Sequence, residues 1–308
     1  AAYLEEHLSG FQQYDNGIVR QLVERITVVD AETIRIKFRY SDVEIEQAMC
    51  SNGTKEQLLM EIFITGDTHG DFRRFRPDIF YEQEHMTKED LVLVCGDFGG
   101  IWYGDPRDDA GLDWLDSLPY TTAFVLGNHE NYDAYKGYPR EEWNGGQIQR
   151  LRPSVLHLMR GQVYELNGRK FFTMGGASSH DIQDGILEPD DPDFEEKFQQ
   201  LEQRGALFRV NHRSWWAEEL PSEAEYLEAR ANLARVHWNV DYIISHCCPS
   251  SIQDVFSGGM FKKDALTEFF DEVRQKCTFQ YWFFGHYHSN MVIEKKYAML
   301  YEQIIRLK

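Results

Sequence analysis

Five short apolar segments, each running directly into a polar end with a glycine or proline, constrain the fold of this chain most strongly. They are EIFITGDTHGD (61–71), LVLVCGDFGG (91–100), TAFVLGNHEN (122–131), DYIISHCCP (241–249) and YWFFGHYH (281–288). Helix patterns lie between several of them, such as the apolar stripe of 264–276 and the capping box of Ser222 and Glu225 in 221–236. Strands and helices that alternate in this way predict an α/β fold.

The polar ends of these segments carry the residues that can do chemistry. They are Asp67, His69, Asp97, Asn128, His129, His246, His286 and His288. Because strand ends of an α/β sheet converge on one edge, we expect these side chains to lie together. Carboxylate, imidazole and amide groups suit divalent metals of intermediate hardness. A lone Gly-Asp or His-x-His is more often a turn or a surface strand, so the prediction depends on the whole series.

The series D-x-H, G-D, G-N-H-E, H and G-H-x-H resembles the calcineurin-like metallophosphoesterase superfamily over residues 60–308. The resemblance implies two mixed β-sheets packed as a sandwich flanked by helices. It assigns one divalent metal to Asp67, His69 and His288. It assigns a second to Asn128, His246 and His286, with Asp97 bridging the two. The metals would be manganese, iron, zinc or nickel.

The same resemblance implies a hydrolase of phosphomonoesters or phosphodiesters. Its nucleophile would be a metal-bridging hydroxide, since two cations lower the pKa of bound water. His129 would be a general acid or a phosphate contact at the leaving oxygen. Serine/threonine protein phosphatases of this superfamily carry an arginine soon after the bridging aspartate and another before Asn-His-Glu. This chain has GDFGG and LGNHE instead, which disfavours a phosphoprotein phosphatase.

Two alternatives to this enzyme stay open. One is a non-catalytic scaffold or binding module on the same fold, which would be expected to lose metal ligands or His129. The other is a nucleic-acid-associated phosphodiesterase. The net charge of −19 disfavours nonspecific binding to nucleic acid. The substrate is therefore predicted only as a phosphoester.

The stretch between Glu130 and His246 is expected to supply the substrate pocket. FFTMGGASSHDIQDG (171–185) has the pattern of a strand that ends in a glycine turn. Its candidate site residues are Ser178, Ser179, His180 and Asp181. The acidic stretch 188–196 predicts a solvated loop or a helix entry.

FRVNHRSWWAEE (208–219) concentrates basic and indole side chains, namely Arg209, His212, Arg213, Trp215 and Trp216. One interpretation is a lid, with arginines that bind phosphate and tryptophans that stack on a base. The other is a packed helix, with tryptophans in the core and arginines paired to carboxylates.

Residues 1–59 are predicted to be a small separate α+β segment, followed by the metallophosphoesterase domain at 60–308. Residues 17–25 have helical spacing, 26–40 alternate as a half-buried hairpin, and 50–57 form a polar linker. The segment resembles the C-terminal end of large serine recombinases without any catalytic motif. Met60 would be a natural start for a free-standing metallophosphoesterase. The segment is therefore interpreted as a fusion or mobile-element remnant, or else as an ordinary accessory subdomain.

Composition adds predictions about location. No apolar run approaches the roughly 18 residues needed to span a bilayer, and the chain shows no secretory signal pattern at its start. The five cysteines lie at no zinc-finger spacing and are interpreted as reduced thiols of a cytoplasmic protein. Cys247 and Cys248 are expected to pack behind a metal ligand. The oligomeric state cannot be predicted from these features.

Overall fold

The computed structural model describes residues 23–30, 33–38, 44–48 and 60–307. The chain divides into two compact units, Ala1–Leu59 and Met60–Lys308. In the first unit, β1 (Val23–Asp30), β2 (Thr33–Phe38) and β3 (Glu44–Ala48) form an antiparallel sheet in that order. The β1–β2 pair is the predicted hairpin, and β3 was not predicted.

The helix predicted over 17–25 is wrong at its end. Strand β1 already begins at Val23, because the run of valine, isoleucine and threonine that follows favours extended backbone. Residues 17–22 and the linker at 50–57 lie outside the described residues. The likeness of this unit to recombinases stays a prediction.

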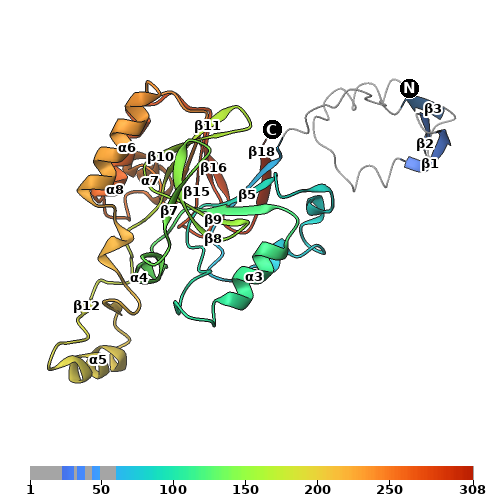
Figure 1. Cartoon of the computed structure of the whole chain (residues 1–308). Coiled ribbons are helices and arrows are strands. Elements are labelled where there is room, and N and C mark those ends of the chain that lie inside the picture. The colour runs from blue at the N-terminus through green and yellow to red at the C-terminus, as the bar shows by residue number, and fades with distance from the viewer. Residues whose placement is uncertain (1–22, 31–32, 39–43, 49–59, 308) are drawn as a thin grey trace. The chain divides into compact units, whose positions relative to one another are not determined.

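The second unit contains two large mixed sheets (Figure 1). The seven-stranded sheet has the order β18-β4-β5-β6-β9-β8-β7. Its strands are β4 (Ile62–Thr65), β5 (Leu91–Val94), β6 (Thr121–Phe124), β7 (Arg140–Trp143), β8 (Gly146–Arg152), β9 (Val155–Leu158) and β18 (Ile304–Leu307). The centre, β4-β5-β6-β9, is parallel, and the flanking strands are antiparallel.

The six-stranded sheet has the order β10-β11-β14-β15-β17-β16. Its strands are β10 (Gln162–Leu166), β11 (Arg169–Met174), β14 (Tyr242–Ser245), β15 (Tyr281–Phe284), β16 (Met291–Ile293) and β17 (Tyr297–Met299). Here β11, β14, β15 and β17 run parallel between two antiparallel edges. All five strands predicted from the apolar segments are therefore present.

The two sheets pack face to face, and the alternation of side chains shows it. Ile62 and Ile64 of β4 share a buried cluster with Ile244 of β14 and Phe283 of β15. Phe63, between the two isoleucines, points the opposite way into a second cluster with residues of the helix α3 (Asp109–Ser117). Because successive side chains of a strand alternate between its faces, each central strand contributes to two buried layers. This is the predicted sandwich.

Helices cover the outer faces of the sandwich (Figure 1). The group α6, α7 and α8 lies on the six-stranded side, and α3 packs on strands of the seven-stranded sheet. The bounds are α3 (Asp109–Ser117), α4 (Tyr132–Tyr135), α5 (Phe194–Gln203), α6 (Glu223–Arg235), α7 (Ser250–Ser257) and α8 (Ala265–Lys276). Short 3-10 turns are η1 (Arg73–Phe75), η2 (Tyr81–His85) and η3 (Ala217–Glu219). Both helices predicted from patterns, α6 with its capping box and α8, are confirmed.

A smaller excursion interrupts the chain between β11 and α6. It contains α5 and the parallel pair β12 (Gly185–Leu187) and β13 (Phe208–Val210), and it projects from the body of the domain (Figure 1). The acidic stretch 188–196 leads into α5, as expected of a helix entry. Within the described part of the chain, no helix is both long enough and apolar enough to cross a bilayer.

Candidate metal centre and catalytic site

The carboxyl ends of four parallel strands from the two sheets meet at one place. Asp67 follows β4, Asp97 follows β5, His246 follows β14, and His286 follows β15. Asn128 and His129 come after β6 and join them. Because the sheets face each other, residues more than 200 positions apart in the chain become neighbours. The convergence expected from the sequence is therefore observed.

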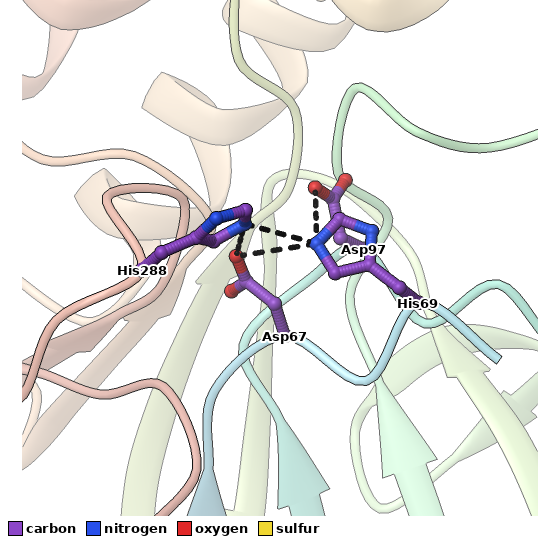
Figure 2. A group of neighbouring side chains, drawn as sticks. All are labelled: Asp67, His69, Asp97 and His288. Carbon is purple, nitrogen blue, oxygen red and sulfur yellow. Dashed lines mark hydrogen bonds and ion pairs between the residues drawn. The ribbon is translucent and has the colours of Figure 1, made fainter. Parts of the chain in front are cut away.

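Four of these side chains form one tight group, shown in Figure 2: Asp67, His69, Asp97 and His288. One ligand atom from each lies within 4.8 Å of the others. The Nε2 atom of His69 is 3.0 Å from Nε2 of His288, which in turn is 3.2 Å from Oδ2 of Asp67. The two carboxylates are buried and the two histidines are exposed. Two imidazoles and two carboxylates that converge on one point match the donor set of a divalent transition metal.

Asn128, His246 and His286 form a second group beside the first. The Nε2 atom of His246 lies 3.2 Å from Oδ1 of Asn128 and 3.2 Å from Oδ1 of Asp97. The rings of His246 and His286 are 5.0 Å apart. The opposite oxygen of Asp97, Oδ2, is 3.6 Å from Nε2 of His69 in the first group. Asp97 thus stands between both groups, where a bridging ligand would lie.

The tautomer of His246 suits a ligand role. Its Nδ1 lies 2.8 Å from the carbonyl oxygen of Cys95, to which an Nδ1–H donates, so Nε2 is left to face the group. Burial lowers the pKa of His246, but the charges of Asp97 and Asp67 outweigh it and raise that pKa to about 9. The same negative field favours a cation at this position.

Neighbouring charges also act on Asp97 itself. Burial raises its pKa, yet His246 and the other nearby histidines outweigh that effect and hold the pKa of Asp97 below its ordinary value. The carboxylate is therefore ionised at neutral pH and offers two oxygens to cations.

Glycine is required at two positions of the motifs, Gly127 and Gly285, because a side chain would not fit there. A Cβ on Gly127 would overlap Oδ1 of Asp97, and a Cβ on Gly285 would overlap Oδ1 of Asp67. The backbone must therefore pass directly over the two carboxylates. The residues His69, Asp97, His286 and His288 have φ between 44° and 68°, a left-handed region that non-glycine residues rarely adopt. Such strain gathers at functional sites.

A hydrogen-bonded chain fixes the amide of Asn128. Its Nδ2 donates to Oγ of Ser179 at 3.2 Å, and that hydroxyl donates to Oε2 of the buried Glu219 at 2.6 Å. The amide of Ser179 also donates to Oε1 of Glu219, at 2.9 Å. Because Nδ2 is engaged there, Oδ1 of Asn128 faces His246. Ser179 was a sequence candidate, whereas Glu219 lies 40 residues further on and gave no signal.

Glu130, the last residue of the Asn-His-Glu motif, supports the Asp97 loop. Its buried carboxylate accepts the amides of Phe98 at 2.6 Å and Gly99 at 3.3 Å. Burial and the charge of Asp97 raise the pKa of Glu130 to about 8. The sequence analysis included Glu130 in the motif but predicted no role for it.

His129 is half-buried at the rim of the group. Its amide donates to Oδ1 of Asp97 at 2.8 Å, and its ring is 5.3 Å from that of His69. His69 and His129 line a cavity of 330 Å³ together with Gly99, Trp102 and Arg209. His129 thus lies at an open space beside the ligand groups, as a residue that touches a leaving group must.

The substrate candidates divide into two sets. His180 lies 3.4 Å from His286 between their Nε2 atoms and stacks on Phe261, and Asp181 pairs with Arg209. Arg213, in contrast, is exposed and its guanidinium lies over Phe194 at 5.3 Å. The structure therefore brings His180, Asp181 and Arg209 to the site and leaves Arg213 by the projecting excursion.

The segment 208–219 is not the predicted packed helix. It forms β13, a turn and η3. Trp216 is nevertheless in the core and donates from Nε1 to Asp133 at 2.7 Å, while Trp215 is half-buried. Cys247 and Cys248 are buried, as expected for packing residues, and burial raises the pKa of both thiols.

Comparison with known proteins agrees with this geometry. Residues 60–290 match the family model described as calcineurin-like phosphoesterase. The chain therefore belongs to the calcineurin-like phosphoesterase family, and the expected class of hydrolase acting on phosphoester bonds is the class of that family.

Three curated relatives are lariat debranching enzymes. The chain is 24% identical over 150 residues to lariat debranching enzyme A of Xenopus laevis, a match covering 42% of this chain and 26% of the relative. It is 34% identical over 91 residues to the Arabidopsis thaliana enzyme (23% and 21% covered). It is 28% identical over 142 residues to the Drosophila pseudoobscura pseudoobscura enzyme (41% and 25% covered). The chain thus spans about a quarter of the length of these relatives or less.

Proposed function

We propose that this chain is a dinuclear metal-dependent phosphoesterase that hydrolyses phosphomonoesters or phosphodiesters. The observation that carries the proposal is the position of Asp97, whose two oxygens face two separate ligand groups at 3.2 and 3.6 Å. One divalent cation would be held by Asp67, His69 and His288, and the second by Asn128, His246 and His286. Asp97 would contact both.

The donor set fits such cations, because each group combines oxygen and imidazole nitrogen in a partly buried setting. Two divalent cations, when bound, supply the nucleophile by lowering the pKa of water and neutralise the charge of the phosphate. The protein keeps the ligands in place through the tight glycine turns and through the Ser179–Glu219 chain. His129 donates a proton to the leaving oxygen as the phosphorus–oxygen bond breaks.

The names of the relatives and the absent arginines bear on the substrate. A phosphoprotein phosphatase is disfavoured by the missing arginines, whereas relatives named for debranching lariats favour a nucleotide phosphodiester. The prediction that nucleic acid is disfavoured as a partner therefore needs a direct test, by gel shift at low salt with a branched oligonucleotide. Manganese as the cation and a cytoplasmic location remain parts of the proposal.

The test combines metal analysis with a substrate panel. We expect up to two transition-metal ions per chain, and hydrolysis of bis-p-nitrophenyl phosphate or p-nitrophenyl phosphate that a chelator abolishes and added manganese restores. Asp105→Asn is the matched control for the site aspartates, because Asp105 is exposed and pairs with Arg107. The proposal would be refuted if the purified protein contained no metal and a chelator left its hydrolytic activity unchanged. Bound metal without hydrolysis of any ester would favour the scaffold alternative.

A further inference from the structure

A cavity of 330 Å³ lies beside His129, where the leaving group of a substrate would be bound. Its volume is at the lower end of the range of about 300–1,000 Å³ that is typical of small-molecule sites. Five residues line it: His69, Gly99, Trp102, His129 and Arg209. Two of these, Trp102 and Arg209, have no part in holding the cations. They determine what kind of group fits.

Trp102 lines the cavity and is held in place by its neighbours. Its carbonyl oxygen accepts Nδ2 of Asn131 at 2.7 Å, and its amide donates to Oδ1 of Asp108 at 3.2 Å. Its ring meets the buried ring of Trp216 edge-on, at 5.9 Å and 81°. Because the indole of Trp102 is only half-buried, part of it remains available to a ligand. A rigid aromatic surface of this kind binds flat rings at little cost in conformational entropy.

Arg209 brings a hydrogen-bonding guanidinium to the cavity. Its side chain is 28% exposed and pairs with Asp181, whose side chain is 35% exposed. A flat ring with hydrogen-bonding groups is favoured, because it can lie on Trp102 while its polar edge meets Arg209.

The charge of the chain limits the length of the ligand. Half-buried Asp108 holds the backbone of Trp102 at the cavity wall, and the chain carries a net charge of −19. A long polyanion would be repelled beyond the cavity itself. A group with one ring and few phosphates would not.

We propose that this cavity binds the leaving group of the substrate as a nucleoside, with its base against Trp102. The inference rests on the proposed phosphoesterase function. In the reaction, a new bond forms between phosphorus and the oxygen of water, and the bond between phosphorus and the nucleoside oxygen breaks. The nucleoside oxygen takes a proton from His129, and the proton of the attacking water passes to solvent. Trp102 is thus a specificity-determining residue for the alcohol that leaves.

Two diesters with the same retained half separate the effect of the base from that of the chemistry. They are adenylyl-(3′→5′)-adenosine and adenosine 3′-(methyl phosphate), whose leaving groups are both alkoxides and differ only in the nucleoside. Trp102→Ala should lower kcat/KM about 5- to 150-fold on the dinucleoside, the range for one base stacked on one ring, and change it little on the methyl ester. Trp102→Phe should retain most of the preference, since a ring remains. Trp143→Ala, at a half-buried indole of β7 that packs near Tyr164 of β10, should leave the preference for the dinucleoside intact.

A binding measurement keeps the two proposals apart. Adenosine should bind the metal-free wild-type chain in calorimetry, ribose should not, and Trp102→Ala should weaken adenosine binding by a similar factor. If the loaded wild type hydrolyses no ester at all, the proposed function fails while calorimetry still tests the cavity. Three results would each overturn the nucleoside site. They are an equal loss of kcat/KM on the two diesters in Trp102→Ala, the same selective loss in Trp143→Ala, and adenosine binding that is unchanged in Trp102→Ala.

Discussion

Removing the hydroxyl of Ser179 should selectively weaken the second cation site. The Oγ atom of Ser179 accepts Nδ2 of Asn128 at 3.2 Å and donates to the buried carboxylate of Glu219 at 2.6 Å. In Ser179→Ala the Asn128 amide loses the partner that keeps Oδ1 turned toward His246. Partners of metal ligands are typically worth about 10–100-fold in metal affinity. Because the bond at 3.2 Å joins two neutral groups, we expect the lower end, about tenfold.

Stability should fall as well, for a separate reason. Glu219 is 2% exposed and loses one of its two hydrogen bonds from Ser179, keeping only the amide at 2.9 Å. A hydrogen bond to a charged group contributes about 1.5–3 kcal/mol. Burial raises the pKa of Glu219, and we expect a loss of about 1.5–3 kcal/mol in urea unfolding.

The assay is a manganese titration of the metal-free protein that resolves two binding events. Ser178→Ala is the matched control, since Ser178 is the adjacent half-buried serine and has no hydrogen bond among the described side chains. Ser179→Thr, which keeps the hydroxyl, should restore the second affinity. If Ser179→Ala binds both cations as the wild type does, or weakens both equally, Ser179 does not orient Asn128.

Four further predictions follow from single features. Asp97→Asn should lower kcat/KM more than an alanine at any one terminal ligand, because it removes charge from both groups; equal losses would exclude the bridging role. His129→Ala should cost about 10²–10⁴-fold on an alkyl ester but much less on a nitrophenyl ester, whose leaving group needs no proton; an equal loss would indicate phosphate positioning. Burial and neighbouring arginines lower the pKa of His157 to about 3, so its contribution to stability is complete above pH 6.5 and is lost as pH falls toward 3. His157→Gln should remove up to about 1.4 kcal/mol per pH unit of that dependence in urea unfolding between pH 6.5 and 5. A chain beginning at Met60 should fold, bind metal and keep full turnover on small phosphoesters; insoluble protein would make the first unit integral to the enzyme.

The sequence was sufficient for the parts of the site that depend on local order. Each ligand candidate comes directly after a buried strand, and parallel strands must present those ends at one edge. The glycine before Asp97 and the one before Asn128 belong to the same local pattern, because the turn has no room for a side chain. For this reason the convergence of Asp67, Asp97 and His246 could be predicted without coordinates.

Contacts between distant segments could not be predicted in this way. The buried guanidinium of Arg160 donates to the carbonyl of Gly175 at 3.0 Å, to the hydroxyl of Tyr132 at 2.8 Å and to the carbonyl of Glu219 at 3.1 Å. No periodicity or spacing in the sequence marks these partners. The helix predicted over 17–25 fails at its end, residues 23–25, for a related reason, since pairing between strands decides against a short helical pattern.

The residues that would bind the cations and the residues that would select the substrate come from different parts of the fold. Residues that would hold the cations are fixed at the ends of buried strands, so their positions follow from the fold that the family shares. Trp102 comes from the loop after β5 and Arg209 from β13, both outside the two large sheets. The chain between β11 and α6 supplies Arg209, Ser179 and Glu219 together. A change in that excursion can alter the leaving-group cavity without moving a strand. The same change can alter the second cation site through Asn128, so substrate choice and metal affinity should vary together among chains that differ mainly in this segment.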